Sequence, residues 1–311
     1  MHPFRGGRNL ESVTSIAITG ASGLIGTALA HRLATDGHRV LRFTRQSSSG
    51  ADSIAWNPKD GSIEADKLRG VDAVVHLAGA GIGDKRWTTD YKREILESRT
   101  KSTSLLSSAL ADLSDGPKVL LSGSAIGIYG ESESSTFTED SPAGQGFLAD
   151  VCVQWEAETA AAEKAGVRVA HLRTGIVLSP KGGALKKLLP LFKLGAGGRM
   201  GSGRQWQSWI SIDDEIAAIG HLLSSNVTGP VNLTAPRPVT QAEFTKTLAK
   251  VLKRPSFVPV PSFGPKLLLG SELADALLFT GQKVMPTVLE RDGFTFAHAD
   301  LESALRSLLS K

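Results

Sequence analysis

Residues 15–33 read S-I-A-I-T-G-A-S-G-L-I-G-T-A-L-A-H-R-L, and this stretch predicts a strand, a glycine turn and a helix. Ile16 and Ile18 alternate with small residues as in a short buried strand, whereas the apolar residues from Ile25 onward recur at helical spacing. Gly20, Gly23 and Gly26 form a G-x-x-G-x-x-G pattern between them. The pyrophosphate of a dinucleotide needs main-chain N–H groups at a positively polarised helix end, and this pattern provides such an end. The competing interpretation is an ordinary glycine-bearing loop.

Strand and helix patterns alternate along the chain after this unit. The predicted strands are 39–44, 72–77, 118–122 and 167–172, and the predicted helices are 89–113 and 147–164. This alternation predicts parallel crossovers and an α/β fold with a doubly wound parallel sheet. Ligands of such sheets bind beyond the carboxyl ends of the strands, so we expect the functional residues there.

The same patterns predict the domain organisation. We expect residues 1–14 to be a disordered lead-in and residues 15–180 to form a dinucleotide-binding domain, with 205–252 returning to its core. Residues 181–204 and 253–311 are expected to form a small, mostly helical substrate-side domain. Within it the apolar segment 267–279 is too short to span a bilayer and predicts a core helix or part of a subunit contact. The sequence is therefore compatible with a homo-oligomer.

Composition excludes several classes of protein. The 311 residues are 41% apolar, and 35 basic against 31 acidic residues are interleaved, so the net charge of +4 does not indicate a nucleic-acid partner. Cys152 is the single cysteine, so an intramolecular disulfide is excluded and no metal site is expected. No run approaches the ~18 apolar residues of a membrane helix. We expect a cytoplasmic protein with no membrane partner and a small-molecule substrate.

The residue after the second predicted strand indicates which cofactor is used. Enzymes that prefer NADH usually carry an acidic residue there, which binds the ribose 2′-hydroxyl and repels a 2′-phosphate. Here the strand ends F-T-R-Q, without an acid, and Arg45 offers a guanidinium fork. The sequence therefore predicts NADP(H), with Arg45 on the 2′-phosphate; the alternative is a solvated surface arginine.

Several motifs resemble a known family. T-G-A-S-G-L-I-G at 19–26, V-V-H-L-A-G at 74–79 and I-Y-G at 128–130 resemble the extended short-chain dehydrogenases/reductases, which include the nucleotide-sugar epimerases. A narrower, epimerase-like atypical subfamily is similar at D-K-R-W (84–87), E-S-R (97–99), L-R-T-G-I-V-L (172–178) and W-Q-S-W-I-S-I-D-D (206–214). Its C-terminal domain of unknown function is similar at L-L-L-G-S-E-L-A (267–274), G-Q-K-V-M-P (281–286) and G-F-T-F (293–296).

The resemblance covers the chain from Ser15 onward, and it implies a Rossmann fold, a dinucleotide cofactor and activity as a nucleoside-diphosphate-sugar epimerase. Some members of the subfamily have been called cell-division inhibitors. We expect the cofactor to contact the glycine turn, the strand ends and the E-S-R motif: Gly20, Ser22, Gly23, Leu24, Ile25, Gly26, Arg45, Leu77, Ala78, Gly79, Arg99, Ser122 and Arg173.

The usual catalytic pair of the superfamily is missing. That pair is a tyrosine followed four residues later by a lysine, whose ammonium helps the phenol to exchange a proton near neutral pH. Here Phe147 lies near the tyrosine position and Val151 near the lysine position. Ser124, as the family's serine, and Tyr129 stay as candidate proton donors, although either could serve local structure instead. Cys152 has no local cue for a reactive thiol.

Basic residues on two predicted loops are candidates for substrate binding. Lys85 and Arg86 follow the strand that ends at Leu77, and Arg199 and Arg204 lie in a glycine-rich loop. Guanidinium groups match phosphate geometry, so these residues could bind an anionic substrate such as a nucleotide diphosphate; otherwise they are solvated surface charges.

The sequence therefore supports two candidate functions. One is an NADP(H)-dependent oxidoreductase or epimerase with non-standard catalytic residues and a polar substrate. The other is a non-catalytic dinucleotide-binding protein that senses redox state or regulates a partner.

Overall fold

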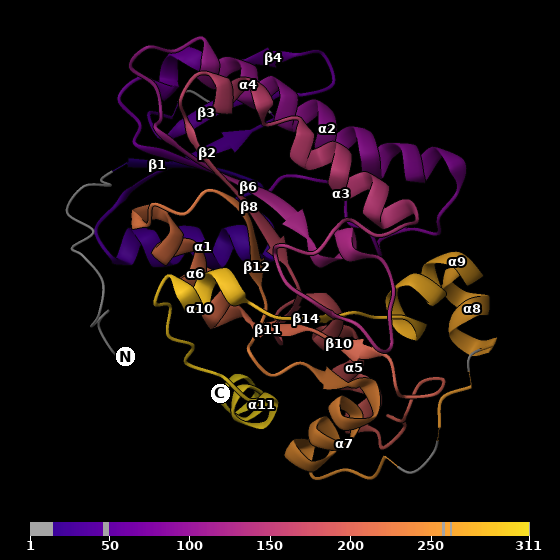
Figure 1. Ribbon diagram of the computed structural model, residues 1–311. Helices are drawn as coiled ribbons and strands as arrows, with labels where there is room; N and C mark the ends of the chain where they lie inside the picture. Colours follow the sequence, from indigo (N-terminus) through magenta and orange to yellow (C-terminus); the bar gives the residue numbers. More distant parts are fainter. Residues whose placement is uncertain (1–14, 46–49, 257–258, 262, 311) are drawn as a thin grey trace.

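The computed structural model describes residues 15–45, 50–256, 259–261 and 263–310, and its largest element is an eight-stranded sheet (Figure 1). The strand order is β12-β8-β6-β5-β1-β2-β3-β4, and all neighbours are parallel except β3 and β4. The strands are β1 (Ser15–Thr19), β2 (Arg39–Thr44), β3 (Ser53–Asn57), β4 (Ser62–Ile63), β5 (Ala73–His76), β6 (Val119–Ala125), β8 (Arg168–Thr174) and β12 (Gly229–Leu233). The predicted lead-in, residues 1–14, lies outside the described residues.

Helices cover both faces of this sheet, which confirms the doubly wound α/β prediction. On one face α1 (Leu24–Thr35) and α6 (Ile212–Ser224) pack together over a core that includes Ile16, Ile18 and Leu29. On the other face lie α2 (Thr89–Ala111), α3 (Phe147–Ala157) and α4 (Ala160–Lys164), with Leu106 and Ala162 in the core. The central strands are buried on both faces, as a parallel sheet requires.

The predicted helix 147–164 is wrong in one respect, because it is interrupted between α3 and α4. The hydroxyl of Thr159 donates to the carbonyl of Glu156 and also lies 3.0 Å from His171 Nε2. Such side-chain bonds compete with the regular helical pattern. Thr159 is fully buried, so this local arrangement is held by tertiary packing.

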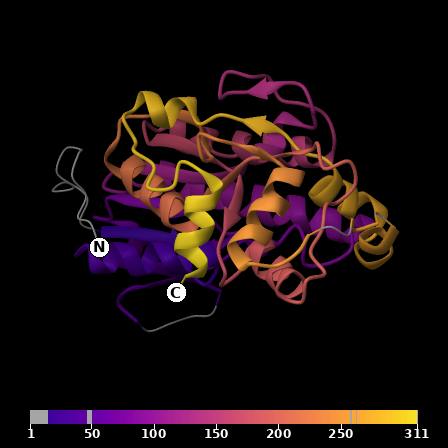
Figure 2. The same cartoon turned by 90° about the horizontal axis from the view of Figure 1, so that it is seen from below.

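The second half of the chain builds a smaller unit beyond the end toward which the β6 arrow points (Figure 1). Its helices α5 (Gly183–Lys193), α7 (Gln241–Leu252) and α11 (Leu301–Leu309) share one apolar cluster with Trp209 and Leu178. Figure 2 shows α11 beside α7. The short strand pairs are β9 (Ile176–Leu178) with β11 (Trp209–Ser211), β10 (Trp206–Gln207) with β13 (Val239–Thr240), and β7 (Thr136–Phe137) with β14 (Lys283–Val284).

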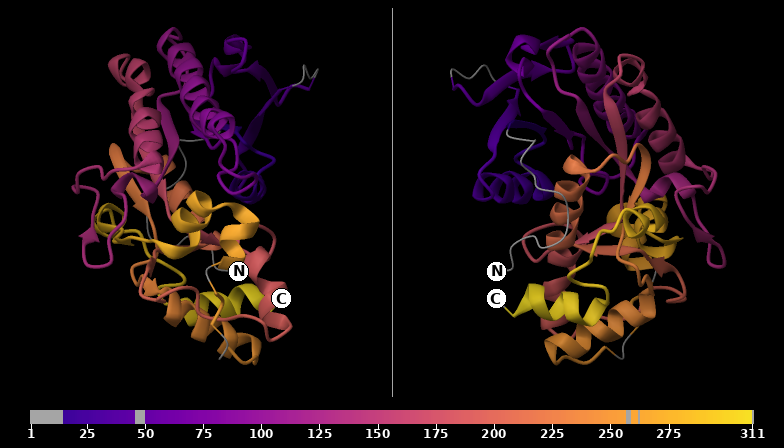
Figure 3. Two further views of the ribbon diagram at one scale, coloured as in Figure 1. Left: turned by 90° about the vertical axis from the view of Figure 1, so that its right-hand side faces the viewer. Right: turned by 60° about the vertical axis from the view of Figure 1, so that its left-hand side comes forward.

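The apolar segment 267–279 is not a single core helix. It is divided among α8 (Phe263–Leu269), α9 (Ser271–Ala274) and a π-helical turn, η3 (Asp275–Phe279). Leu273 and Ala274 are buried, but Leu267 and Leu268 are 76% and 73% exposed. The core-helix prediction is therefore wrong for the first part, because α8 lies at the periphery of the molecule with one side facing solvent (Figures 1 and 3).

The remaining elements are short. They are η1 (Ala65–Leu68), η2 (Ile126–Tyr129) and α10 (Thr287–Arg291), and α10 packs against β12. Among the described residues, none of the helices combines the length and the apolar character that a bilayer crossing requires.

Candidate functional site

The glycine turn between β1 and α1 has the geometry that the sequence predicts. Gly20 has φ +64°, and a Cβ there would lie 2.8 Å from the carbonyl oxygen of Leu77. A Cβ on Gly26 would lie 2.2 Å from the carbonyl oxygen of Gly20, so only glycine permits this approach of helix and turn. Gly23 caps α1 without a side chain, which leaves the first-turn N–H groups for a ligand. The turn therefore fits a dinucleotide pyrophosphate.

A buried histidine holds the neighbouring loop after β5. Thr19 Oγ1 accepts from the N–H groups of Leu77 and Ala78, so its own proton is donated to His76 Nδ1, 2.7 Å away. His76 Nε2 must then carry the ring proton, and it lies 3.0 Å from Thr103 Oγ1. Burial lowers the pKa of His76 to about 3, so the ring stays neutral. His76 thus orients the loop and is not a base.

A cavity of about 1470 Å³ extends from the glycine turn across the carboxyl ends of β1, β2, β3 and β5. Its lining joins the glycine turn, the ends of β2 and β3, the loop after β5 and the outer side of α2. The sequence-predicted residues on its wall are Gly20, Ser22, Gly23, Arg45, Leu77, Ala78 and Gly79. Four further residues line the cavity that the sequence did not indicate: Trp56, Asn57, Ser98 and Ser102. Nothing in the sequence pattern distinguishes them from ordinary strand and helix residues.

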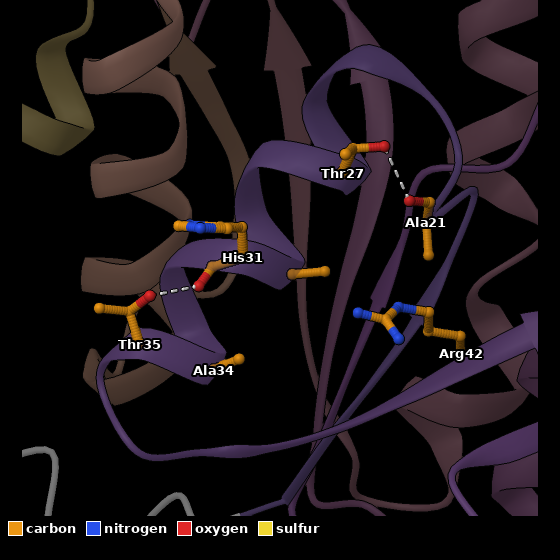
Figure 4. Close-up of a pocket in the computed structure, with 7 residues that line it drawn as sticks. Ala21, Thr27, His31, Ala34, Thr35 and Arg42 are labelled. Carbon is orange, nitrogen blue, oxygen red and sulfur yellow. Dashed lines mark hydrogen bonds between the residues drawn. The ribbon is translucent and has the colours of Figure 1, made fainter.

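A second, smaller hollow of about 620 Å³ lies between α1 and β2 and shares Ala21 and Arg42 with the large cavity. Figure 4 shows the guanidinium of Arg42 directed toward α1, while Thr27 and Thr35 are bonded to backbone carbonyls. Arg42 is exposed on β2, three residues before Arg45, which follows the end of that strand. In the described part of the chain neither guanidinium forms an ion pair. The sequence analysis did not identify Arg42 as a site residue. The feature that could have indicated it is a basic residue at an exposed position of β2.

The two candidate proton donors lie in a buried polar network at the carboxyl ends of β6 and β8. Ser124 Oγ donates to Glu156 at 2.6 Å, and Arg173 binds the same carboxylate through Nε and Nη2 at 2.8 and 2.9 Å. Tyr129 accepts from Arg173 at 2.9 Å and donates to Asn232 at 2.7 Å. Both hydroxyl protons are therefore engaged by protein groups in this structure.

The charges in this network stabilise one another. Burial alone opposes ionisation of Glu156, but the hydrogen bonds from Arg173 and Ser124 and the charge of Arg173 outweigh it, so its pKa lies below the ordinary value. Burial raises the pKa of Tyr129 despite the adjacent guanidinium. Arg173 was predicted to contact cofactor; the structure places its guanidinium in this ion pair. Ser122 Oγ is buried without a partner among the described residues.

The four candidate substrate-binding cations are on two separate loops and already contact protein groups. Lys85 pairs with Glu94, and Arg86 donates to the carbonyls of Leu267 and Leu268 at the end of α8. Arg199 donates to the carbonyl of Ser202, and Arg204 pairs with Glu133. Trp87 Nε1 donates to the carbonyl of Ile82, which anchors the D-K-R-W loop.

Arg99, which was predicted to contact the cofactor, does not line the large cavity, and Cys152 is not placed to react. Arg99 is 7% exposed and stacks on Trp155, with its guanidinium carbon 5.0 Å from the ring centroid. Cys152 is buried in α3, and burial raises the pKa of its thiol to about 11, so it stays protonated. Within the residues that the structure describes, no three His, Cys, Asp or Glu side chains come together in a group that could hold a metal ion.

The fold and the site define a dinucleotide-binding protein, and comparison with known proteins places it in a family. Residues 16–234 match the model of the NAD dependent epimerase/dehydratase family, and residues 260–308 match a "Domain of unknown function (DUF1731)". The chain belongs to the NAD dependent epimerase/dehydratase family, which confirms the resemblance seen in the sequence.

Its relatives are epimerase family proteins that match over almost the whole chain. "Epimerase family protein Mb2239" of Mycobacterium bovis is 44% identical over 93% of this chain and 96% of the relative. "Epimerase family protein SDR39U1 homolog, chloroplastic" of Arabidopsis thaliana is 39% identical over 96% of this chain and 88% of the relative. These names give the family and no reaction.

Solved structures agree with the fold. The crystal structure of "human epimerase family protein SDR39U1 (isoform2) with NADPH" is 32% identical and has a TM-score of 0.86, covering 96% of this chain and 99% of that chain. DesIV, a dTDP-glucose 4,6-dehydratase from Streptomyces venezuelae solved with NAD, is 20% identical, covers 96% of each chain and has a TM-score of 0.75. DesIV supports the fold alone.

Proposed function

We propose that this protein is an NADP(H)-dependent oxidoreductase or epimerase that acts on a polar small molecule. The observation that carries this proposal is the pair of exposed guanidiniums, Arg42 and Arg45, at the end of β2, since neither the described strand nor Arg45 after it offers an acid there. The pair favours an extra phosphate on the adenosine side and leaves a ribose hydroxyl without its usual acidic partner. The human relative's structure with NADPH agrees with this choice of cofactor.

Different residues of the chain bind the two phosphate groups of the cofactor and hold the protons for the reaction. The first-turn N–H groups of α1 hold the pyrophosphate, and Arg45 with Arg42 holds the 2′-phosphate. When bound, the cofactor would accept or supply a hydride. Ser124 and Tyr129 hold protons at the carboxyl ends of β6 and η2, and either hydroxyl must exchange its partner, Glu156 or Asn232, before it can donate to a substrate.

One observation favours a second candidate, a non-catalytic dinucleotide-binding regulator that senses redox state or acts in cell division. Where a tyrosine and a lysine would act, Phe147 and Val151 belong to an apolar cluster with Tyr91 and Ile95. Together with the engaged hydroxyls of Ser124 and Tyr129, this leaves neither the usual pair nor the two candidate hydroxyls free to exchange a proton in the structure described. Such a protein would bind the cofactor tightly and turn over no substrate.

Fluorescence titration with NADPH and NADH, followed by absorbance assays, tests both candidates. We expect wild type to bind NADPH at least tenfold more tightly than NADH, and the variant R42Q/R45Q to lose this preference. The control R32Q, a charge of α1 that pairs with Asp36, should keep it. Equal affinity for the two cofactors in wild type would overturn the NADP(H) assignment.

Turnover separates the enzyme from the regulator. A panel of sugar nucleotides, quinones and aldehydes is presented with NADPH or NADP⁺, and S124A and Y129F are compared with wild type on whichever substrate reacts. Loss of activity in either variant supports the proton-transfer role. Unchanged activity in both would show that the proposed donors are wrong, and tight cofactor binding without any turnover favours the regulator.

A further inference from the structure

The helix pair α2 and α3 contains a buried cation that no carboxylate among the described residues neutralises. Arg99 lies one turn after Ile95 on α2 and is 7% exposed. Its Nη1 donates to the carbonyl of Ile95 at 3.0 Å, and in the part of the chain that the structure describes it forms no ion pair. A guanidinium has five N–H donors, and a buried charge is costly unless a partner compensates it. The structure therefore leaves donors available for a ligand.

The neighbouring helix α3 carries no cation at the corresponding place. Val151, which the sequence aligns near the lysine position of the superfamily, is buried in an apolar cluster. Trp155 lies one turn further along α3, and the Arg99 guanidinium stacks on its ring from the opposite helix. The positive charge between these two helices therefore comes from Arg99 of α2, and α3 contributes the ring on which it stacks.

Arg99 also contacts the loop that borders the cofactor cavity. A Cβ on Gly79 would lie 3.3 Å from Cζ and 3.4 Å from Nη1 of Arg99, so the guanidinium packs directly against the Gly79 backbone. Gly79 itself is exposed and lines the cavity. On the other side, the Trp155 ring approaches Gly123 at the end of β6. The cation therefore lies at the carboxyl edge of β5 and β6, where ligands of such sheets meet the protein.

The charge persists at neutral pH. Burial lowers the pKa of Arg99, but an arginine remains protonated across the physiological range. Its titratable neighbours are Cys152 and Tyr91, and burial raises the pKa of both, so neither supplies a negative charge. The hydroxyl of Tyr91 is bonded to the carbonyl of Gly81.

We propose that Arg99 binds a carboxylate of the substrate, which assigns this protein a carboxylate-bearing small molecule as its substrate class. A planar guanidinium matches a carboxylate through two parallel N–H···O bonds. Only 7% of Arg99 is exposed, so a small planar anion can reach the guanidinium more easily than a bulky one. This inference rests on the proposed function, because it takes the carboxyl edge of the sheet as the place where substrate meets cofactor.

Calorimetric titration of oxalate into the NADPH-saturated protein tests this assignment. We expect oxalate to bind wild type, to bind R99M at least tenfold more weakly and to bind R99K with intermediate affinity. R168M is the matched control, because Arg168 is a partly buried arginine at the opposite edge of the sheet that donates to backbone carbonyls. Its affinity for oxalate should equal that of wild type.

Four outcomes would overturn the proposal. Wild type could fail to bind oxalate, wild type and R99M could bind it equally well, or inorganic phosphate could bind more tightly than oxalate. The fourth outcome is a loss of NADPH affinity in R99M as large as the loss for oxalate, which would make Arg99 a cofactor ligand. Failure of wild type to bind NADPH at all would instead contradict the proposed function.

The melting temperature of the ligand-free variants gives a separate readout. Removing an unpaired buried charge should leave R99M as stable as wild type or more stable. A marked drop in R99M together with unchanged oxalate binding per folded molecule would assign Arg99 to the scaffold and refute the binding role.

Discussion

Breaking the Arg173–Glu156 ion pair should destabilise the protein far more than breaking an exposed pair. The two side chains are 9% and 12% exposed, and two short bonds join them. E156Q leaves the guanidinium of Arg173 buried with the Tyr129 hydroxyl and no countercharge. Removing one partner of a buried pair costs about 3–5 kcal/mol, and the altered bond from Ser124 adds about 1 kcal/mol.

Urea unfolding of a double-mutant cycle measures this effect. E156L and R173M should each cost about 3–5 kcal/mol, whereas E156L/R173M should cost less than either, because it leaves no uncompensated charge. E97Q, which removes the exposed pair with Lys101, is the control and should cost under about 1 kcal/mol. A single-variant cost under about 1 kcal/mol, or a double variant equal to the sum of the singles, would refute the reasoning.

Three further predictions concern single positions. G26A should abolish NADPH binding and lower the melting temperature, because its Cβ would lie 2.2 Å from the Gly20 carbonyl oxygen; unchanged binding in a calorimetric titration would contradict this. Burial raises the pKa of Glu215 to about 8, so its neutral form is stabilising at low pH and that stability is lost as pH rises from about 4.5 toward 8. E215Q should therefore gain melting temperature over wild type at pH 8 and little at pH 4.5, and an equal difference at both values would argue against a buried, protonated carboxyl. T240A removes one half of the capping box with Glu243 at the start of α7 and should cost about 1 kcal/mol in urea unfolding, with T100A, inside α2, as a comparison.

Local patterns were enough to predict the parallel sheet and the glycine turn. The strand at 15–19, the turn at Gly20 to Gly26 and the helix after it depend on residues adjacent in the chain, so periodicity and glycine spacing reveal them. Chain order then determined the topology, because a strand, a helix and a parallel strand connect with one handedness.

The site beyond the glycine turn could be predicted only in part. Arg45 and the loop from Leu77 to Gly79 were identified because they follow predicted strands, and the structure places them on one cavity. Arg42 was missed because a strand residue can bind a ligand only where no helix covers its side of the sheet. Here a hollow beside α1 leaves Arg42 accessible, which only the tertiary structure shows. The exposure of Leu267 and Leu268 likewise follows from where α8 lies.

The amino-acid sequence by itself determined the α/β fold, the family and the glycine turn, since each depends on short-range patterns along the chain. Tertiary structure alone decided the state of the candidate proton donors. Ser124 and Glu156 are 32 residues apart, and Tyr129 and Asn232 are 103 residues apart, so no spacing along the chain indicates that they bond. The charge on Arg99 is the same kind of property: whether a cation is neutralised depends on which side chains the folded chain brings within a few ångströms of it.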